Sequence, residues 1–204
     1  YGEIWANNIK EILKENNLIN RSIHIISANM HSVLNSIYAK EALKDESEKH
    51  NGFELYQLLS NSDSKPLQKK VKDFASKNGL IYVKDTSGTN INVQIIDTSK
   101  ITNSISTFHN KNVSEENPVI IVMDYAFGEQ AYETMDELLK PYKTETDHIH
   151  LNVKSVSIMG KAGILEGGKG DIMIPNAHIF EGTADNYPFT NELSKEDLQG
   201  FGVN

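Results

Sequence analysis

The chain has 204 residues, 38% of them hydrophobic, which is enough for one sizeable packed domain, and it contains no cysteine. The absence of cysteine excludes a disulfide framework, a thiol nucleophile and a cysteine-bound metal, and it fits a reducing, cytoplasmic location. The formal net charge of −8 argues against a nucleic-acid partner, and no apolar run approaches the about 20 residues that a membrane helix needs, so we expect neither nucleic acid nor membrane as partner.

The first half of the chain alternates helical and extended patterns. Apolar residues at helical spacing, such as Ile9 and Leu13, predict a first helix that ends near residues 16–17. A short apolar run after it predicts a strand, and two more short strands flank the turn-rich segment 85–90. The expected helices cover residues 3–16, 31–43, 53–59 and 66–78, and the expected strands cover residues 23–27, 80–83 and 91–96.

The second half of the chain has clearer apolar runs. Residues 118–123 are continuously apolar, as expected for a strand that is covered on both faces, and a helix is expected at 129–140. Residues 153–159 predict another buried strand, followed closely by strands at 171–174 and 177–181. The alternation predicts an α/β fold in which one mostly parallel sheet carries helices on both faces.

Ligands of such sheets bind outside the carboxyl ends of the strands. Three loops meet that description, and we expect them to converge on one pocket: residues 27–32, 124–128 and 160–163. Gly160 and Gly163 lie where the backbone must either turn sharply or let a ligand come close, whereas the later glycines let the chain reverse before the next strand. Neither a P-loop nor a G-x-G-x-x-G fingerprint is present.

Several segments resemble, in order, the nucleoside phosphorylase superfamily. Residues 156–165 (VSIMGKAGIL) and 170–174 (GDIMI) resemble its strand, its Gly-(Ser/Thr)-Ala-Gly-Gly turn and its Val-Gly-Asp-Ile-Val segment. Three weaker likenesses accompany these segments. Residues 23–33 resemble the first strand and the Ala-Met-Glu-Glu-Glu loop of the nucleosidases, and residues 119–128 resemble the superfamily's Ser-Gly-Ile-Gly loop and helix. Residues 181–187 resemble the stretch that follows the Val-Gly-Asp-Ile-Val segment in several members. The chain looks closest to an uncharacterised Bacteroidetes-type branch, and residues 45–115 have no counterpart and are interpreted as an insertion.

The resemblance implies a three-layer αβα fold with a twisted, mostly parallel central sheet, and cleavage of an N-glycosidic bond. Such a site must stabilise positive charge on the sugar and protonate the leaving base while water or phosphate attacks. By resemblance, the turn against the ribose and the nucleophile is formed by Gly160, Lys161, Ala162 and Gly163. The remaining substrate-binding candidates are Ala28, Asn29, Met30, Tyr125, Phe127, Gly128 and Glu181, the last of which could instead only end a strand.

The sequence departs from the superfamily at the positions that carry chemistry. Lys161 replaces the usual Ser or Thr, and it either holds a phosphate as a point charge or is a solvated side chain. No arginine occurs in residues 124–129, where phosphorolytic members place a phosphate ligand, so hydrolysis is favoured. The acidic residue of the nucleosidase first loop is replaced by His31 or Ser32, of which His31 could act as a base or be structural. Asp124 completes the catalytic candidates, unless it caps the following helix.

No cofactor is expected, unless phosphate serves as a co-substrate, and no metal site is predicted. His148 and His150 are two residues apart on an extended segment, but no third ligand accompanies them. Asp171 is expected to fix a turn rather than to do chemistry.

The superfamily's Met-Glu motif and the acid that protonates the base lie further toward the C-terminus, and neither is found in these residues. Residues 1–204 are therefore expected to form a single, incomplete α/β domain that associates with itself or with a missing C-terminal part and is inactive alone. For the full-length protein we expect cleavage of the N-ribosidic bond of a small-molecule nucleoside or nucleotide. The alternative is a non-catalytic module that binds a nucleotide or sugar phosphate on the same fold.

Overall fold

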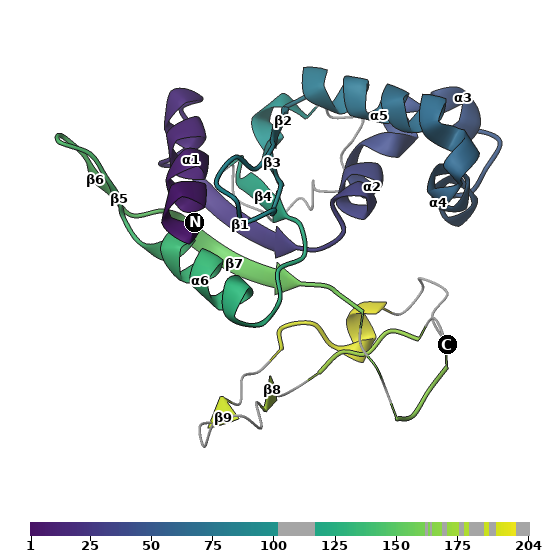
Figure 1. Cartoon of the computed structure of the whole chain (residues 1–204). Helices are drawn as coiled ribbons and strands as arrows, with labels where there is room; N and C mark the ends of the chain where they lie inside the picture. Colours follow the sequence, from purple (N-terminus) through teal and green to yellow (C-terminus); the bar gives the residue numbers. More distant parts are fainter. Residues whose placement is uncertain are drawn as a thin grey trace. The chain divides into compact units, whose positions relative to one another are not determined.

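The computed structural model describes residues 1–101, 117–161, 163, 165–168, 171–175, 178–179, 186–187 and 191–198. The chain forms two compact units, Tyr1–Gly160 and Lys161–Asn204. The first contains the central sheet and the α-helices labelled in Figure 1.

A five-stranded sheet forms the centre of the first unit. Its strands lie in the order β2 (Leu80–Val83), β3 (Val93–Asp97), β4 (Val119–Met123), β1 (Ser22–Ser27) and β7 (Asn152–Ile158). β1 is parallel to both β4 and β7, whereas β3 is antiparallel to both β2 and β4, so β3 alone runs against the others. The expected α/β class and mostly parallel sheet are confirmed, and the expected strands in residues 23–27, 80–83, 91–96, 119–123 and 153–159 all belong to this sheet.

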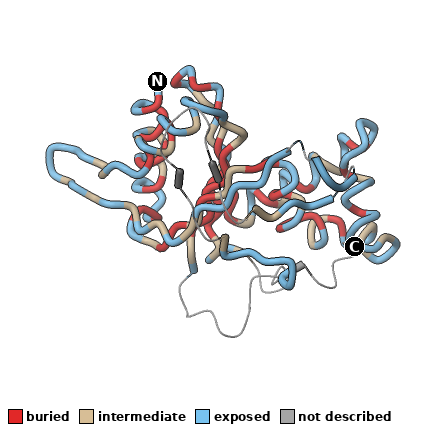
Figure 2. The backbone as a smooth tube through the Cα atoms, turned by 90° about the horizontal axis from the view of Figure 1, so that it is seen from below, coloured by how far each residue is buried: buried red, intermediate tan, exposed pale blue. Residues whose placement is uncertain are grey.

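Helices cover both faces of the sheet. They are α1 (Gly2–Glu15), α2 (Met30–Ala42), α3 (Lys44–Ser47), α4 (Gly52–Ser60), α5 (Lys65–Lys77) and α6 (Gly128–Leu139). α1 packs against α6 on one face, and α2 packs against α5 on the other (Figure 1). Side chains of β4 alternate between the two apolar cores: Ile121 belongs to the core under α1 and α6, and Ile120 to the core under α2 and α5. Figure 2 shows the buried residues gathered along the central strands and the inner sides of these helices.

How deeply a strand is buried depends on its position in the sheet. All five residues of β4 are buried, as its continuous apolar run predicts for a strand with neighbours on both sides. β7 was expected to be buried too, and this prediction is wrong, because its residues are half-buried or exposed and Ile158 is 80% exposed. The reason is that β7 is the last strand in the order and has only β1 beside it. Its face toward His24 is also polar, since the Ser155 hydroxyl lies 2.7 Å from Nδ1 of His24.

The second unit differs from the prediction. Residues 171–174 form no strand, and β8 (His178–Ile179) pairs with β9 (Asn186–Tyr187) in a separate two-stranded antiparallel sheet rather than joining the main sheet. The Asp171 carboxylate accepts the Gly168 N–H at 2.6 Å, while the Asp171 N–H donates to the Gly168 carbonyl. These bonds make the turn that was expected of Asp171 and compete with an extended conformation. The rest of the expected strand at 177–181 lies outside the described residues.

A buried lysine joins α1 to the end of α6. Lys10 is 1% exposed, and its Nζ donates a 2.7 Å hydrogen bond to the carbonyl of Glu137 in the last turn of α6. Burial lowers the pKa of Lys10, although the Glu137 carboxylate opposes this effect. The contact satisfies a helix-terminal carbonyl and complements the negative end of the helix dipole, so it fixes the position of α6.

A second polar network fastens the amino ends of the strands. Arg21, just before β1, donates from Nη1 to Asp97 of β3 at 2.7 Å and from Nε to the carbonyl of Asn117, two residues before β4, at 2.8 Å. Ser99 donates both its backbone N–H and its hydroxyl to the same Asp97 oxygen. Burial alone would raise the pKa of the Asp97 carboxyl, but hydrogen bonds from Ser99 and Arg21 and the charge of Arg21 outweigh it and lower the pKa.

Acid is expected to remove the stabilisation that Asp97 provides. Because the pKa of Asp97 is lower in the folded state, the unfolded state binds more protons as the pH falls through about 4, and stability drops there. The free energy of unfolding, measured with urea between pH 3 and 7, should therefore fall more steeply below about pH 4 in the wild type than in Asp97→Asn. Asp73→Asn, which changes an exposed carboxylate on α5, should keep the wild-type pH dependence, and equal slopes for all three proteins would contradict the role of Asp97.

Candidate functional site

The connections that follow two adjacent parallel strands diverge at the carboxyl edge of the sheet. β1 leads into α2, which packs on one face, whereas β4 leads into α6, which packs on the other. The two chains therefore diverge where the strands end: Ser27 pairs with Met123, and the Ala28 N–H donates to the Met123 carbonyl at 3.2 Å. Such a switch point is the usual ligand position in α/β sheets.

The loop after β7 reaches the same edge. The Met159 N–H donates to the Ser27 carbonyl at 2.9 Å, and a Cβ built on Gly160 would lie 4.0 Å from the Tyr125 ring. The structure thus brings the first two predicted loops together with the start of the third. Lys161 and Gly163 are exposed residues of the second unit, and Ala162 and Glu181 lie outside the described residues.

The first loop combines buried anchors with an exposed helix start. Ala28 and Met30 are buried in the core, so their side chains hold the loop in place. Asn29 is the N-cap of α2, and its side chain accepts the Ser32 N–H at 3.1 Å. Asn29, His31 and Ser32 are exposed, and the first turn of α2 contains no acidic residue. The positive end of the α2 dipole is therefore not neutralised by a negative side chain in the first turn of the helix.

The second loop presents a carboxylate and two aromatic rings. Asp124 is half-buried, and one of its carboxylate oxygens accepts the Tyr125 N–H at 2.9 Å. It does not cap α6, because the N-cap residue is Phe127 and makes no side-chain cap. The rings of Tyr125 and Phe127 lie 6.1 Å apart at 31°, and Phe127 is 75% exposed. Gly128 has a φ of +55°, a conformation that favours glycine, and has open space around it.

A further loop lies at this edge, and its position there was not predicted from the sequence. Because β3 is antiparallel to β4, the segment between β2 and β3 also lies at the carboxyl edge, where the Asn92 carbonyl accepts the Asp124 N–H at 3.1 Å. Gln130 of α6 donates to the Thr89 carbonyl at 2.6 Å. The turn-forming composition of residues 85–90 predicts a loop, but only strand pairing places it beside Asp124.

Asp85 organises this additional loop. Its carboxylate accepts backbone N–H groups of Ser87, Gly88 and Asn90. Burial would raise the pKa of Asp85, but the hydrogen bonds from Ser87, Asn90 and Gly88 outweigh it and lower the pKa. Since its oxygens are engaged in this way, Asp85 shapes the loop, and Asp124 is the better placed carboxylate for a ligand.

A cavity of about 420 Å³ lies at the opposite, amino edge of the sheet. Polar residues line it: Asn20, Arg21, Ser22, Ser99, Asn117 and Asn152. Its charged group, Arg21, is already held by Asp97 and by the carbonyls of Asn117 and Pro118. We therefore place the candidate site at the carboxyl edge rather than in this cavity.

Two other features are absent from the part of the chain that the structure describes. That part contains no group of three or more His, Asp or Glu side chains arranged to hold a metal ion. Nor does any helix within it have the length and apolar character needed to cross a membrane.

Comparison with known proteins gives one family and no named relative. Searches of the curated proteins and of the solved structures find no match. Residues 39–202 match the family model described as "Family of unknown function (DUF6909)". This match spans most of the chain, from the last turn of α2 through the site loops after β4 and β7 into the second unit. The chain therefore belongs to the family of unknown function DUF6909.

Proposed function

We propose that the switch point at the ends of β1 and β4 binds a nucleoside or nucleotide, and that the full-length protein cleaves its N-ribosidic bond. The observation that carries the proposal is the aromatic pair Tyr125–Phe127 beside the switch point. An aromatic ring that is 75% exposed beside a switch point offers a flat apolar face on which a planar base can stack. The ordered resemblance to nucleoside-cleaving enzymes supports the same class of ligand.

The negative charge at the start of α6 favours hydrolysis over phosphorolysis. Glu129 lies in the first turn of α6 and opposes a phosphate at that helix end. The first turn of α2 lacks an acidic residue, so the ribose or the phosphate of a nucleotide fits best at Asn29, His31 and Ser32. A nucleotide would thus place its base on the rings of the second loop and its polar end at the first.

Asp124 is the group proposed to act on the reacting atoms. One carboxylate oxygen is held by the Tyr125 N–H, which orients the group while the other oxygen can activate water. The alternative function is a non-catalytic module that binds a nucleotide or sugar phosphate on the same fold. The observation that favours it is the polar, exposed character of the α2 start, which needs no catalytic carboxylate to bind an anion.

Removal of the Phe127 ring tests the binding site. Phe127→Ala is expected to weaken binding of adenosine, inosine, uridine or AMP, whichever binds the wild type, by roughly 5- to 150-fold, because stacking contributes about 1–3 kcal/mol per base. Isothermal titration calorimetry of the full-length protein measures the effect. The matched control is Tyr132→Ala, which removes an equally exposed ring, 75%, from the body of α6 and should leave the affinity unchanged.

The outcomes separate the two functions. Release of free base without added phosphate would support hydrolysis, whereas binding without release would support the non-catalytic module. If none of the four compounds binds, or if both aromatic substitutions weaken binding equally, the proposed site is wrong.

A further inference from the structure

A short hairpin after α6 is firmly attached to the first unit. Its strands β5 (Tyr142–Lys143) and β6 (His148–Ile149) are antiparallel, with Lys143 opposite His148. The Asp147 carboxylate accepts the Thr144 hydroxyl at 2.9 Å and the Thr146 hydroxyl at 3.2 Å, and it pairs with Lys14 of α1. Tyr142 and Ile149 pack against the apolar core under α1 and α6. These contacts therefore hold the hairpin in a fixed position against the first unit.

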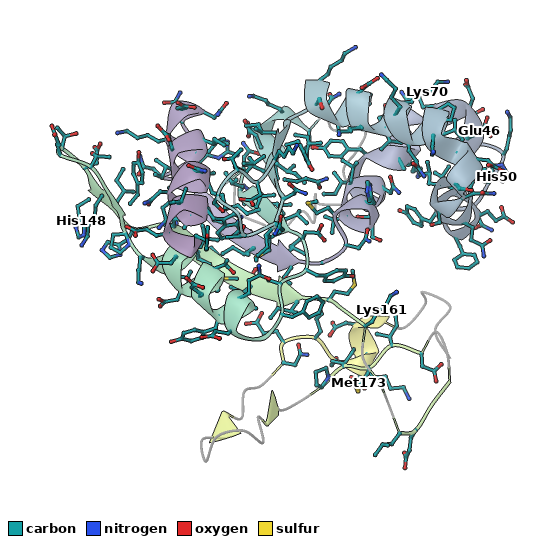
Figure 3. The ribbon with its side chains drawn as sticks, in the orientation of Figure 1. Glu46, His50, Lys70, His148, Lys161 and Met173 are labelled. Atoms are coloured by element: carbon teal, nitrogen blue, oxygen red, sulfur yellow. The ribbon has the colours of Figure 1, made fainter. Side chains whose placement is uncertain are left out.

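The β5–β6 hairpin places two imidazole rings side by side. Because side chains alternate along a strand, the inward position of Ile149 puts His148 and His150 together on the outer side. Both residues are exposed, and their ring centroids are 5.2 Å apart with 76° between the ring planes. Figure 3 shows His148 projecting from the hairpin.

We propose that His148 and His150 form a two-imidazole site for a first-row transition-metal ion such as Zn²⁺. Two imidazoles that bind one tetrahedral Zn²⁺ at about 2.0–2.1 Å place their ring centroids roughly 5 Å apart, which is the separation present in the hairpin. The site needs only side-chain rotation to bind, because the backbone already holds the two rings at this spacing. Water fills the remaining coordination positions.

The surrounding charges decide which ions can use this site. Lys143 lies directly across from His148, and one oxygen of the neighbouring Asp147 carboxylate accepts from Lys14 and from the two threonine hydroxyls. Ions such as Mg²⁺ and Ca²⁺ need several carboxylate or carbonyl oxygens, and two imidazoles do not supply these. Ions that bind imidazole nitrogen strongly, such as Zn²⁺, Ni²⁺ and Cu²⁺, can bind despite the nearby lysine.

Titration of the full-length protein with Zn²⁺ by calorimetry at pH 7.5, in a buffer that does not bind metals, tests the proposal. Each of His148→Ala and His150→Ala should weaken Zn²⁺ binding at the highest-affinity site at least tenfold, since either change reduces a chelate to a single imidazole. The double variant His148→Ala/His150→Ala should lose little more Zn²⁺ affinity than either single variant. Lys143→Ala should strengthen binding, and Mg²⁺ should produce no binding heat at this site.

The matched control is His50→Ala. His50 is a half-buried histidine, and its ring lies 3.7 Å from a Glu46 oxygen (Figure 3). It would be the tighter site if Zn²⁺ bound to a histidine next to a carboxylate rather than to two imidazoles. The control should keep the wild-type affinity. The proposal is overturned if His50→Ala removes the tightest Zn²⁺ site, or if the His148→Ala and His150→Ala proteins bind Zn²⁺ as tightly as the wild type. Circular dichroism establishes that each variant is folded.

Discussion

Asp124→Asn is expected to slow the release of base by the full-length protein by roughly 100- to 10,000-fold, with little change in substrate affinity. Asparagine has nearly the same shape, and its amide oxygen can still accept the Tyr125 N–H that holds Asp124 at 2.9 Å. What it lacks is the basic oxygen that would activate water. The loss should therefore appear in kcat, measured by following free base from the preferred nucleoside, while calorimetry gives an unchanged Kd.

Glu129→Gln is the matched control for Asp124→Asn. Glu129 is an exposed carboxylate in the first turn of α6, close in sequence to Asp124, but it is not proposed to act on the substrate. Its replacement should leave kcat within about twofold, because an exposed surface charge contributes little. Full activity of Asp124→Asn would assign this residue a structural role. If the wild type binds but releases no base, the non-catalytic function is the correct one.

Arg21→Ala is expected to lower the free energy of unfolding by about 3 kcal/mol, near the low end of the 3–5 kcal/mol that breaking a buried ion pair costs. The Asp97 side chain is only 5% exposed, so removal of Arg21 leaves a buried carboxylate without its closest cation. The same change removes donors to the carbonyls of Asn117 and Pro118 before β4. Urea unfolding at pH 7 measures the loss.

Two further variants test whether the loss of stability comes from leaving the buried Asp97 carboxylate unpaired. Lys100→Ala removes a second cation, whose Nζ lies 3.5 Å from the other Asp97 oxygen but whose side chain is 60% exposed, and should cost less than about 1 kcal/mol. Arg21→Ala combined with Asp97→Asn should be more stable than Arg21→Ala alone, because the stranded charge is gone. Equal losses for Arg21→Ala and Lys100→Ala would contradict this account.

Local chemistry alone determined much of this protein. The continuous apolar run of β4 predicts a fully buried strand, and the observed burial of all its residues agrees. Pro66 at the start of α5 and the Asn29 N-cap of α2 mark helix starts that need no distant partner to be recognised. Asp171 forms its turn with Gly168, only three residues away, and was predicted for the same reason. These features depend on residues close in sequence.

The candidate site depends instead on strand pairing, which the local pattern does not contain. Pairing puts β7 at the end of the strand order, so a run that reads as buried is exposed. The antiparallel direction of β3 carries residues 85–92 to the edge where Asn92 binds the backbone of Asp124. The contact between the rings of His148 and His150 likewise needs Ile149 to face the core. Contacts between residues far apart in sequence decided which side chains meet, because each of these segments has several partners that would satisfy its own pattern equally well.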